Sequence, residues 1–192
     1  MYLPEHHDEH LAEVRAYLSS GRAVAVGECG LDFYVEGLDA QRQRELFLAQ
    51  LHIAREFDLP VVLHARRAVD EVIATLRRVG GLRGVVHSYS GSEEQARQLY
   101  RLDFFLGLGG PVTYERAQRL RRLVATMPIE HLLVETDAPD QPDSQHRGER
   151  NEPGRLGFVV ETIADLRGVT AEEIGEATAA NARRLFGQAL AA

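Results

Sequence analysis

The chain has 192 residues, of which 44% are hydrophobic and 27% charged, and its formal net charge is −7 at pH 7. This length and apolar content favour one folded domain with a sizeable core and exclude a disordered chain. The uncharged apolar runs are too short to cross a membrane, so no membrane partner is expected. The N-terminus has no basic or apolar signal region, and the single cysteine excludes an internal disulfide. These features together predict a cytoplasmic location.

Five short runs, each rich in apolar and β-branched residues, are predicted to be strands. Each is nearly continuous in apolar character, as a parallel strand covered on both faces requires. In chain order the predicted strands are Ala23–Gly27, Pro60–Leu63, Gly84–Val86, Phe104–Leu108 and His131–Val134.

Longer amphipathic stretches before, between and after these runs are predicted to be helices, over 8–18, through 46–57, over 69–79, after Ser92, and over 156–166 and 172–186. Capping-box patterns at 92–95 and 170–173 mark two of the helix starts. Strands alternating with helices indicate βα units and a parallel sheet. The spacing suits a (β/α) barrel, in which about 250 residues make eight units. A doubly wound open sheet is the structural alternative.

Four of the predicted strands are followed by a residue that binds metal ions well: Glu28, His64, His87 and Asp137. Because the carboxyl ends of parallel strands meet on one face of the sheet, these residues are expected to lie together. A single such residue is more often merely hydrogen-bonded, but four equivalent positions favour a metal site. Two imidazoles and two carboxylates suit Zn²⁺ or Mn²⁺, with Mg²⁺ open through the carboxylates.

The other histidines lie in loops, in helices or at a strand start, where a role in folding or at the surface is the simpler interpretation. They are therefore left out of the predicted site: His6, His7, His10, His52, His131 and His146.

Four segments resemble the motifs of one enzyme family, in that family's order. Residues 27–34 (GECGLDFY) resemble its GE-x-GLD-[FY] signature, and residues 60–66 (PVVLHAR) its P-[VI]-x-[IL]-H-[SA]-R segment. Residues 84–91 (GVVHSYSG) resemble its G-V-x-H-x-[FY]-S-G block, and residues 132–139 (LLVETDAP) match its LLxETDAP block residue for residue.

Two further segments, 151–153 (NEP) and 181–186 (NARRLF), are similar to the family's C-terminal motifs. On these six motifs the chain is identified as a member of the TatD family of metal-dependent deoxyribonucleases. The resemblance implies a TIM-type (β/α) barrel of the metal-dependent hydrolase superfamily, with residues 1–192 forming a single TatD-like domain. It also implies DNA or another nucleic acid as substrate; the oligomeric state is left open.

The resemblance implies a role for each candidate residue. Glu28 would bridge two divalent ions, and His64 and His87 would hold one of them. Asp137 would bind the other ion and would orient or deprotonate the attacking water, so Glu28 and Asp137 are the predicted catalytic residues. Arg66 is placed to contact a phosphate, although a simply solvated arginine is an equal alternative.

All 22 basic residues are arginines, and the chain has no lysine. Amidase-type members of the superfamily often bridge their metals with a carboxylated lysine. A carboxylate must therefore act as the bridge here, which favours Glu28 and a TatD-type site over that of lactonases and phosphotriesterases.

The chain departs from the family pattern at its beginning. The family's first strand carries an H-x-H pair, which supplies two ligands to the ion shared with Asp137, and no H-x-H occurs in this chain. Residues 1–5 align where the family has a strand ending in G-x-H-P. About five or six of the eight βα units are therefore expected, truncated at the N-terminus. We therefore expect one ion, bound by Glu28, His64 and His87, and weak nuclease activity.

Three functions remain open at this point. The first is phosphodiester hydrolysis of the TatD deoxyribonuclease type, by metal-activated water. The second is hydrolysis of another ester or amide by the same metal site, and the third is an inactive fragment or paralogue. The charge of −7 argues against broad electrostatic binding of DNA but leaves room for a locally positive active site.

Three features near the motifs receive separate interpretations. Cys29 is expected to be a small buried hydrophobe on the side of the strand opposite Glu28. Asp32 would either support a metal ligand or form a turn. The polar segment 140–152, with Arg147 and Arg150, is interpreted as a substrate loop or a solvated connection.

Overall fold

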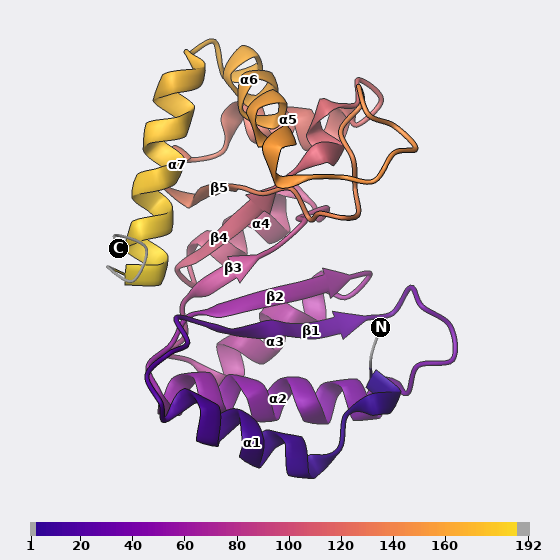
Figure 1. Cartoon of the computed structure of the whole chain (residues 1–192), viewed down its shortest axis with the longest axis vertical. Helices are drawn as coiled ribbons and strands as arrows, with labels where there is room; N and C mark the ends of the chain where they lie inside the picture. The colour runs from indigo at the N-terminus through magenta and orange to yellow at the C-terminus, as the bar shows by residue number, and fades with distance from the viewer. Residues whose placement is uncertain (1–2, 188–192) are drawn as a thin grey trace.

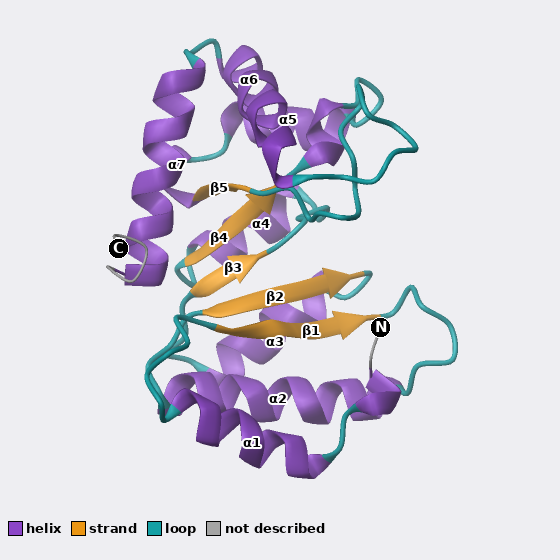
Figure 2. Cartoon of the chain, viewed as in Figure 1, coloured by secondary structure: helices purple, strands orange, loops and turns teal. Residues whose placement is uncertain are grey.

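The computed structural model describes residues 3–187, and within them five strands alternate with helices (Figures 1 and 2). The strands are β1 (Val26–Asp32), β2 (Val61–Arg66), β3 (Gly84–Val86), β4 (Phe104–Leu108) and β5 (Leu132–Val134). The α-helices are α1 (Asp8–Leu18), α2 (Ala40–Glu56), α3 (Val69–Val79), α4 (Glu93–Tyr100), α5 (Gln118–Thr126), α6 (Leu156–Arg167) and α7 (Ala171–Phe186). Short 3-10 turns precede α1, α5, β5 and α6.

All strand pairs are parallel, and the sheet order is β1-β2-β3-β4-β5, the same as the order in the chain. A doubly wound sheet would reverse its strand order at a switch point, and this sheet does not. The strands instead follow one another around a wall, as in a (β/α) barrel. β1 and β5 are the two outer strands, so this wall is open in the described part of the chain.

The two faces of the sheet are covered differently. Val61, Leu63 and Leu106 belong to the large core that the sheet shares with the surrounding helices. The alternate residues Val85, Phe105 and Leu133 form a smaller cluster with Leu185 of α7. Alternation of side chains along β2, β3, β4 and β5 produces this division, and His64 and His87 continue along the second face. β1 is irregular between Val26 and Cys29, and Glu28 lies in this irregular part.

The strand predictions are correct for β3 and β4 and within a few residues for β2 and β5, but the first strand is shifted. The prediction ended it at Gly27, whereas β1 runs from Val26 to Asp32. Its second half, residues 29–32, pairs with residues 63–66 of β2 although it contains glycine and aspartate, which have low strand propensity. Glu28 and His64 therefore lie within strands rather than just beyond them.

Close approach between β1 and β2 explains one of those glycines. A Cβ atom at Gly30 would lie 1.9 Å from the carbonyl oxygen of His64, and the φ angle of Gly30 is +150°. No larger side chain fits between the strands at this position. The glycine that argued against a strand in the sequence thus allows β1 to pack closely against β2.

Both predicted capping boxes are present. The Ser92 hydroxyl accepts a hydrogen bond from the backbone N–H of Gln95, and the Thr170 hydroxyl accepts one from the N–H of Glu173. The pattern did not predict α5, whose buried apolar residues are only Leu123 and Val124. Among the described helices, none is long and apolar enough to span a membrane.

Cys29 is 5% exposed and packs in the large core, as expected for a small hydrophobe. Burial, with the nearby charge of Glu28, raises the pKa of its thiol to about 12. Because only the thiolate reacts, we expect no labelling of the native protein by a thiol reagent at mildly alkaline pH. Labelling should be complete in guanidinium chloride, measured by absorbance of the released chromophore. Rapid labelling of the folded protein would contradict this burial.

Candidate metal centre

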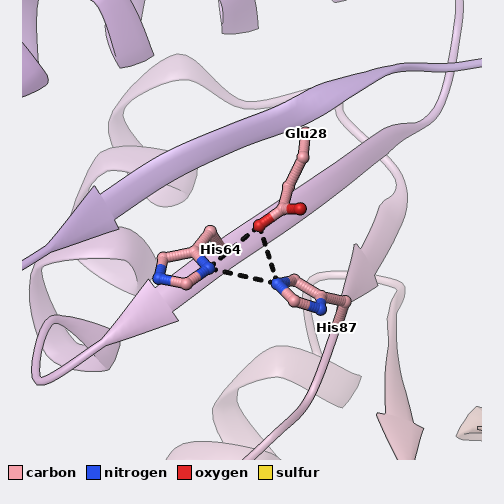
Figure 3. A group of neighbouring side chains, drawn as sticks. All are labelled: Glu28, His64 and His87. Atoms are coloured by element: carbon pink, nitrogen blue, oxygen red, sulfur yellow. Dashed lines mark hydrogen bonds and ion pairs between the residues drawn. The ribbon is translucent and has the colours of Figure 1, made fainter. Parts of the chain in front are cut away.

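Glu28 in β1, His64 in β2 and His87 directly after β3 bring three potential ligand atoms together (Figure 3). The Oε1 atom of Glu28 lies 2.9 Å from Nδ1 of His64 and 2.8 Å from Nε2 of His87. The two imidazole nitrogens are 3.1 Å apart. Three residues separated by more than twenty positions in the sequence therefore aim at one point, as the strand pattern predicted.

The spacing and chemistry of this group fit one divalent ion. Neighbouring ligand atoms about 2.1 Å from a common ion are about 3.0–3.4 Å apart in octahedral or tetrahedral shells. The observed separations of 2.8–3.1 Å are close to that range. Two imidazole nitrogens and one carboxylate oxygen suit Zn²⁺, Mn²⁺ or another borderline ion equally, so the spacing leaves the metal open.

Asp32 holds the imidazole of His64 from behind. Its Oδ2 atom lies 3.0 Å from Nε2 of His64, on the ring edge that faces away from the ligand cluster. Its Oδ1 atom accepts hydrogen bonds from the backbone N–H groups of Tyr34 and Val35. Both interpretations of Asp32 thus hold: it forms a turn, and it fixes the ring orientation that leaves Nδ1 free for a metal.

His87 lies between two groups of carboxylates. Its Nε2 faces Glu28, while its Nδ1 lies 3.8 Å from Oε1 of Glu135 and 4.0 Å from Oδ1 of Asp137. Burial alone would lower the pKa of His87, but the interactions with Glu135 and Glu28 raise it to about 10. The two imidazoles in turn hold the pKa of Glu28 well below its usual value. The cluster therefore places a carboxylate anion against a readily protonated imidazole when no metal is bound.

Space for Glu135 depends on a glycine in the neighbouring strand. A Cβ atom at Gly107 would lie 2.0 Å from Oε2 of Glu135 and 3.1 Å from Cα of His87. The carboxylate occupies this gap and also accepts a 2.6 Å hydrogen bond from the backbone N–H of Ser88. The sequence pattern showed Glu135 inside a motif but assigned it no role, since only the packing reveals its contact with His87.

Asp137 lies beside this cluster rather than in it. Its Oδ2 accepts a hydrogen bond from the side-chain amide of Gln141, whose Oε1 accepts one from the Ser88 hydroxyl. Ser88, Asp137 and Gln141 all have positive φ angles, 46°, 57° and 49°. Such angles are uncommon for non-glycine residues and persist where surrounding contacts hold them. Hydrogen bonds through Gln141 thus join the loops after β3 and β5 next to His87.

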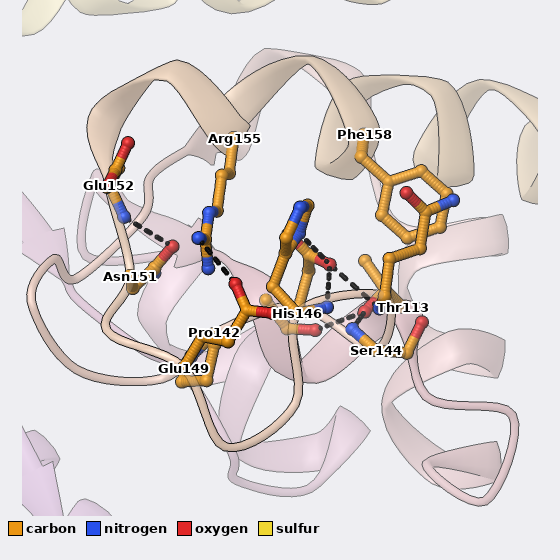
Figure 4. Close-up of polar contacts among 12 residues, drawn as sticks. Thr113, Pro142, Ser144, His146, Glu149, Asn151, Glu152, Arg155 and Phe158 are labelled. Atoms are coloured by element: carbon orange, nitrogen blue, oxygen red, sulfur yellow. Dashed lines mark hydrogen bonds and ion pairs between the residues drawn. The ribbon is translucent and has the colours of Figure 1, made fainter.

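The segment 140–152 is anchored rather than simply solvated (Figure 4). Asn151 is 4% exposed, and its side-chain amide donates to the carbonyl oxygens of Thr136 and Asp140, at 2.6 and 2.8 Å. The buried Asp143 carboxylate accepts from the backbone N–H and the ring of His146. Arg147 and Arg150 are exposed. The loop therefore supports the position of Asp137, and the histidine excluded from the metal site stabilises the loop.

One cavity of about 1010 Å³ adjoins these residues. Glu28, His64, His87, Asp137 and Arg66 line it, and His6 and His10 are also among its lining residues. Arg66 is exposed, with its guanidinium carbon 3.7 Å from the centre of the Tyr34 ring. All predicted site residues thus border one space, although only three form the ligand cluster.

A family model described as "TatD related DNase" matches residues 1–187. The chain belongs to the TatD family of metal-dependent hydrolases. It is 38% identical to the uncharacterized metal-dependent hydrolase YabD of Bacillus subtilis over 181 residues, which cover 93% of this chain and 71% of YabD. It is 39% identical to a protein of Erwinia tasmaniensis named 3'-5' ssDNA/RNA exonuclease TatD, over 93% of this chain and 71% of the relative.

The fold is similar to the crystal structure of YjjV, a TatD homologue from Escherichia coli K12. The TM-score is 0.90 at 38% identity, and the match covers 96% of this chain and 72% of YjjV. The predicted barrel architecture is thereby confirmed. In this TatD family member, the five described strands form the part of the wall that carries Glu28, His64 and His87.

Replacement of Glu135 by glutamine tests the environment of His87 in the metal-free protein. We expect the pKa of His87 to fall from about 10 toward the ordinary 6.5, because one of the two carboxylates that favour its charged form is neutralised. The raised pKa stabilises the fold fully below about pH 6.5, and that contribution is lost as pH rises through about 10. NMR titration of the His87 ring measures the shift. The exposed Glu115→Gln variant should titrate like the parent; equal curves for both variants would refute the contact.

Replacement of Asn151 by alanine tests the loop that carries Asp137. The change removes a buried amide that donates to the carbonyl oxygens of Thr136 and Asp140, so we expect the free energy of unfolding to fall by about 1–2 kcal/mol. Urea denaturation measures this loss. The matched control is Gln145→Ala, because Gln145 is exposed in the same loop and, among the described residues, its side chain has no hydrogen-bond partner. Equal stability of the two variants would show that the amide does not hold the loop.

Proposed function

We propose that the chain is a metal-dependent phosphodiesterase that hydrolyses nucleic acid, with the ion held by Glu28, His64 and His87. The convergence of their three ligand atoms within 2.8–3.1 Å of one another is the observation on which the proposal rests. The name of the Erwinia tasmaniensis relative, a single-strand DNA and RNA exonuclease, supports the choice of substrate.

A divalent ion bound there would supply an activated water and neutralise charge on the phosphoryl oxygens. The chain's own residues would accept the proton, hold the ion and bind the phosphate. Asp137 borders the same cavity and would accept the proton of the attacking water. Glu28 would hold the ion and, where a second ion binds, bridge the pair. Arg66 would pair with a non-bridging phosphate oxygen, for which its planar guanidinium is well suited.

Only one ion is proposed to bind firmly. Asp137 lies on the far side of His87 from the ligand cluster, 4.0 Å from Nδ1, and has Gln141 as its hydrogen-bonded neighbour. Among the described residues, a second ion near it would have Asp137 and Glu28 as its proposed ligands, which are too few for tight binding. The proposed activity is therefore weak compared with that of a two-metal enzyme.

The test combines metal content with hydrolysis. We expect about one Mn²⁺ or Zn²⁺ per chain after dialysis, measured by elemental analysis, and hydrolysis of bis(p-nitrophenyl) phosphate and of a single-stranded oligonucleotide that a chelator abolishes. His64→Ala should remove the ion and the activity together, because two ligands remain. Asp32→Asn should weaken metal binding about 10- to 100-fold, since it disturbs only the orientation of His64.

His146→Ala provides the matched control. His146 pairs with Asp143 in the anchored loop and is outside the ligand cluster, so its loss should leave metal content unchanged. Hydrolysis of simple carboxylic esters without hydrolysis of either phosphodiester would favour a different substrate class. An unchanged metal content in His64→Ala would overturn the proposed centre.

A further inference from the structure

A second cavity, of about 550 Å³, opens beside the main one. Ala65 and Ser90 line both cavities, so the two spaces adjoin. The second cavity lies where α3 and α4 begin, and its basic lining residues are Arg67 and Arg119. No sequence motif singled out this space, and the proposed hydrolysis does not use it.

The charges around this cavity are unevenly paired. Neither Arg67 nor Arg119 lies within ion-pair distance of a carboxylate in the part of the chain that the structure describes. Arg119 donates to the backbone oxygen of Ser90 at 2.6 Å. Of the two acids that line the cavity, Glu71 is paired with Arg44, and Asp70 accepts a hydrogen bond from Gln95. Two arginines thus line an opening in which, among the described residues, Asp70 is the acid without a cationic partner.

Arg66 and Arg67, which line different cavities, lie against the same aromatic ring. Their guanidinium carbons lie 3.7 and 4.7 Å from the centre of the Tyr34 ring, which is 48% exposed. Arg66 lines the main cavity and Arg67 the second. Arg67 has a φ angle of +55°, which is uncommon outside glycine and is found at ligand-binding positions. The turn at the end of β2 thus places Arg66 at the main cavity and Arg67 at the second cavity.

We propose that the second cavity binds another phosphate group of the nucleic-acid strand whose reacting phosphate lies at Glu28, His64 and His87. Arg67 and Arg119 pair with that phosphate, and Tyr34 with Arg66 forms the surface between the two positions. The inference rests on the proposed function, because it assumes a substrate with several phosphates. A positive subsite of this kind explains how a chain of net charge −7 holds a polyanion.

Binding and hydrolysis are measured separately to test the subsite. The binding probe is a fluorescent single-stranded oligodeoxynucleotide in EDTA, followed by anisotropy at several salt concentrations. Arg67→Ala and Arg119→Ala should each raise Kd about three- to tenfold and reduce the slope of log K against log salt by about 0.7, as expected for one lost phosphate contact on a single strand. Asp70→Asn should lower Kd, because it removes the acid that opposes an anion there.

Arg101→Ala is the control for net charge. Arg101 is exposed just after the end of α4, away from both cavities, so the variant loses the same charge without the contact. Bis(p-nitrophenyl) phosphate carries one phosphate, and its hydrolysis should be the same in all four variants and in the parent. Circular dichroism checks folding, and Arg119→Lys, which keeps the charge, should retain most of the binding if Arg119→Ala is unstable.

The outcomes separate the two proposals. If Arg67→Ala and Arg119→Ala bind the oligonucleotide no worse than Arg101→Ala, the subsite is refuted even when hydrolysis is intact. If the parent with Mn²⁺ hydrolyses neither substrate while the binding defects appear, the subsite stands and the proposed hydrolysis fails. A parent that does not bind the oligonucleotide at all refutes the subsite.

Discussion

The candidate centre depends on the parallel register of β1, β2 and β3. Gly30 lies opposite His64, and Leu63 opposite Val86, so His87 follows directly beside His64. A slip of one residue in either pair would turn a ligand from the inner face into the large helix-covered core. The backbone contact at Gly30, which excludes any Cβ atom, prevents such a slip between β1 and β2. The backbone hydrogen bonds that set the strand register thus also set where the candidate metal ligands lie.

Two carboxylates then fix the orientation of the two imidazoles that the strand register brings together. Asp32 holds His64, and Glu135 lies behind His87, each on the ring edge opposite Glu28. A metal ion and a proton compete for the same imidazole nitrogen, so the carboxylates that favour a metal ligand also favour a protonated His87 in the metal-free protein. Binding of an ion would therefore release a proton from the centre.

The sequence was sufficient for residues whose placement follows from their position along a strand and insufficient for those whose contacts follow from packing. The clustering of Glu28, His64 and His87 could be predicted because neighbouring parallel strands present them on one face. The extent of β1 could not, because pairing with β2 overrides the low strand propensity of its second half. Glu135 and Gln141 were missed because their contacts run between loops: Glu135 needs the gap at Gly107, and Gln141 meets Ser88 only in the folded structure.

The open wall of the barrel leaves the candidate site accessible to water. The inner-face cluster around Val85, Phe105 and Leu133 fills the space next to α7, and beyond it the face carries the ligands and borders a cavity of about 1010 Å³. Water enters a space of this size freely, and water weakens each electrostatic interaction within it. If the chain binds metal and phosphate as proposed, direct contacts at short range would have to account for both. The structure offers ligand atoms about 3 Å apart, a carboxylate behind each imidazole, and two exposed arginines placed against one aromatic ring.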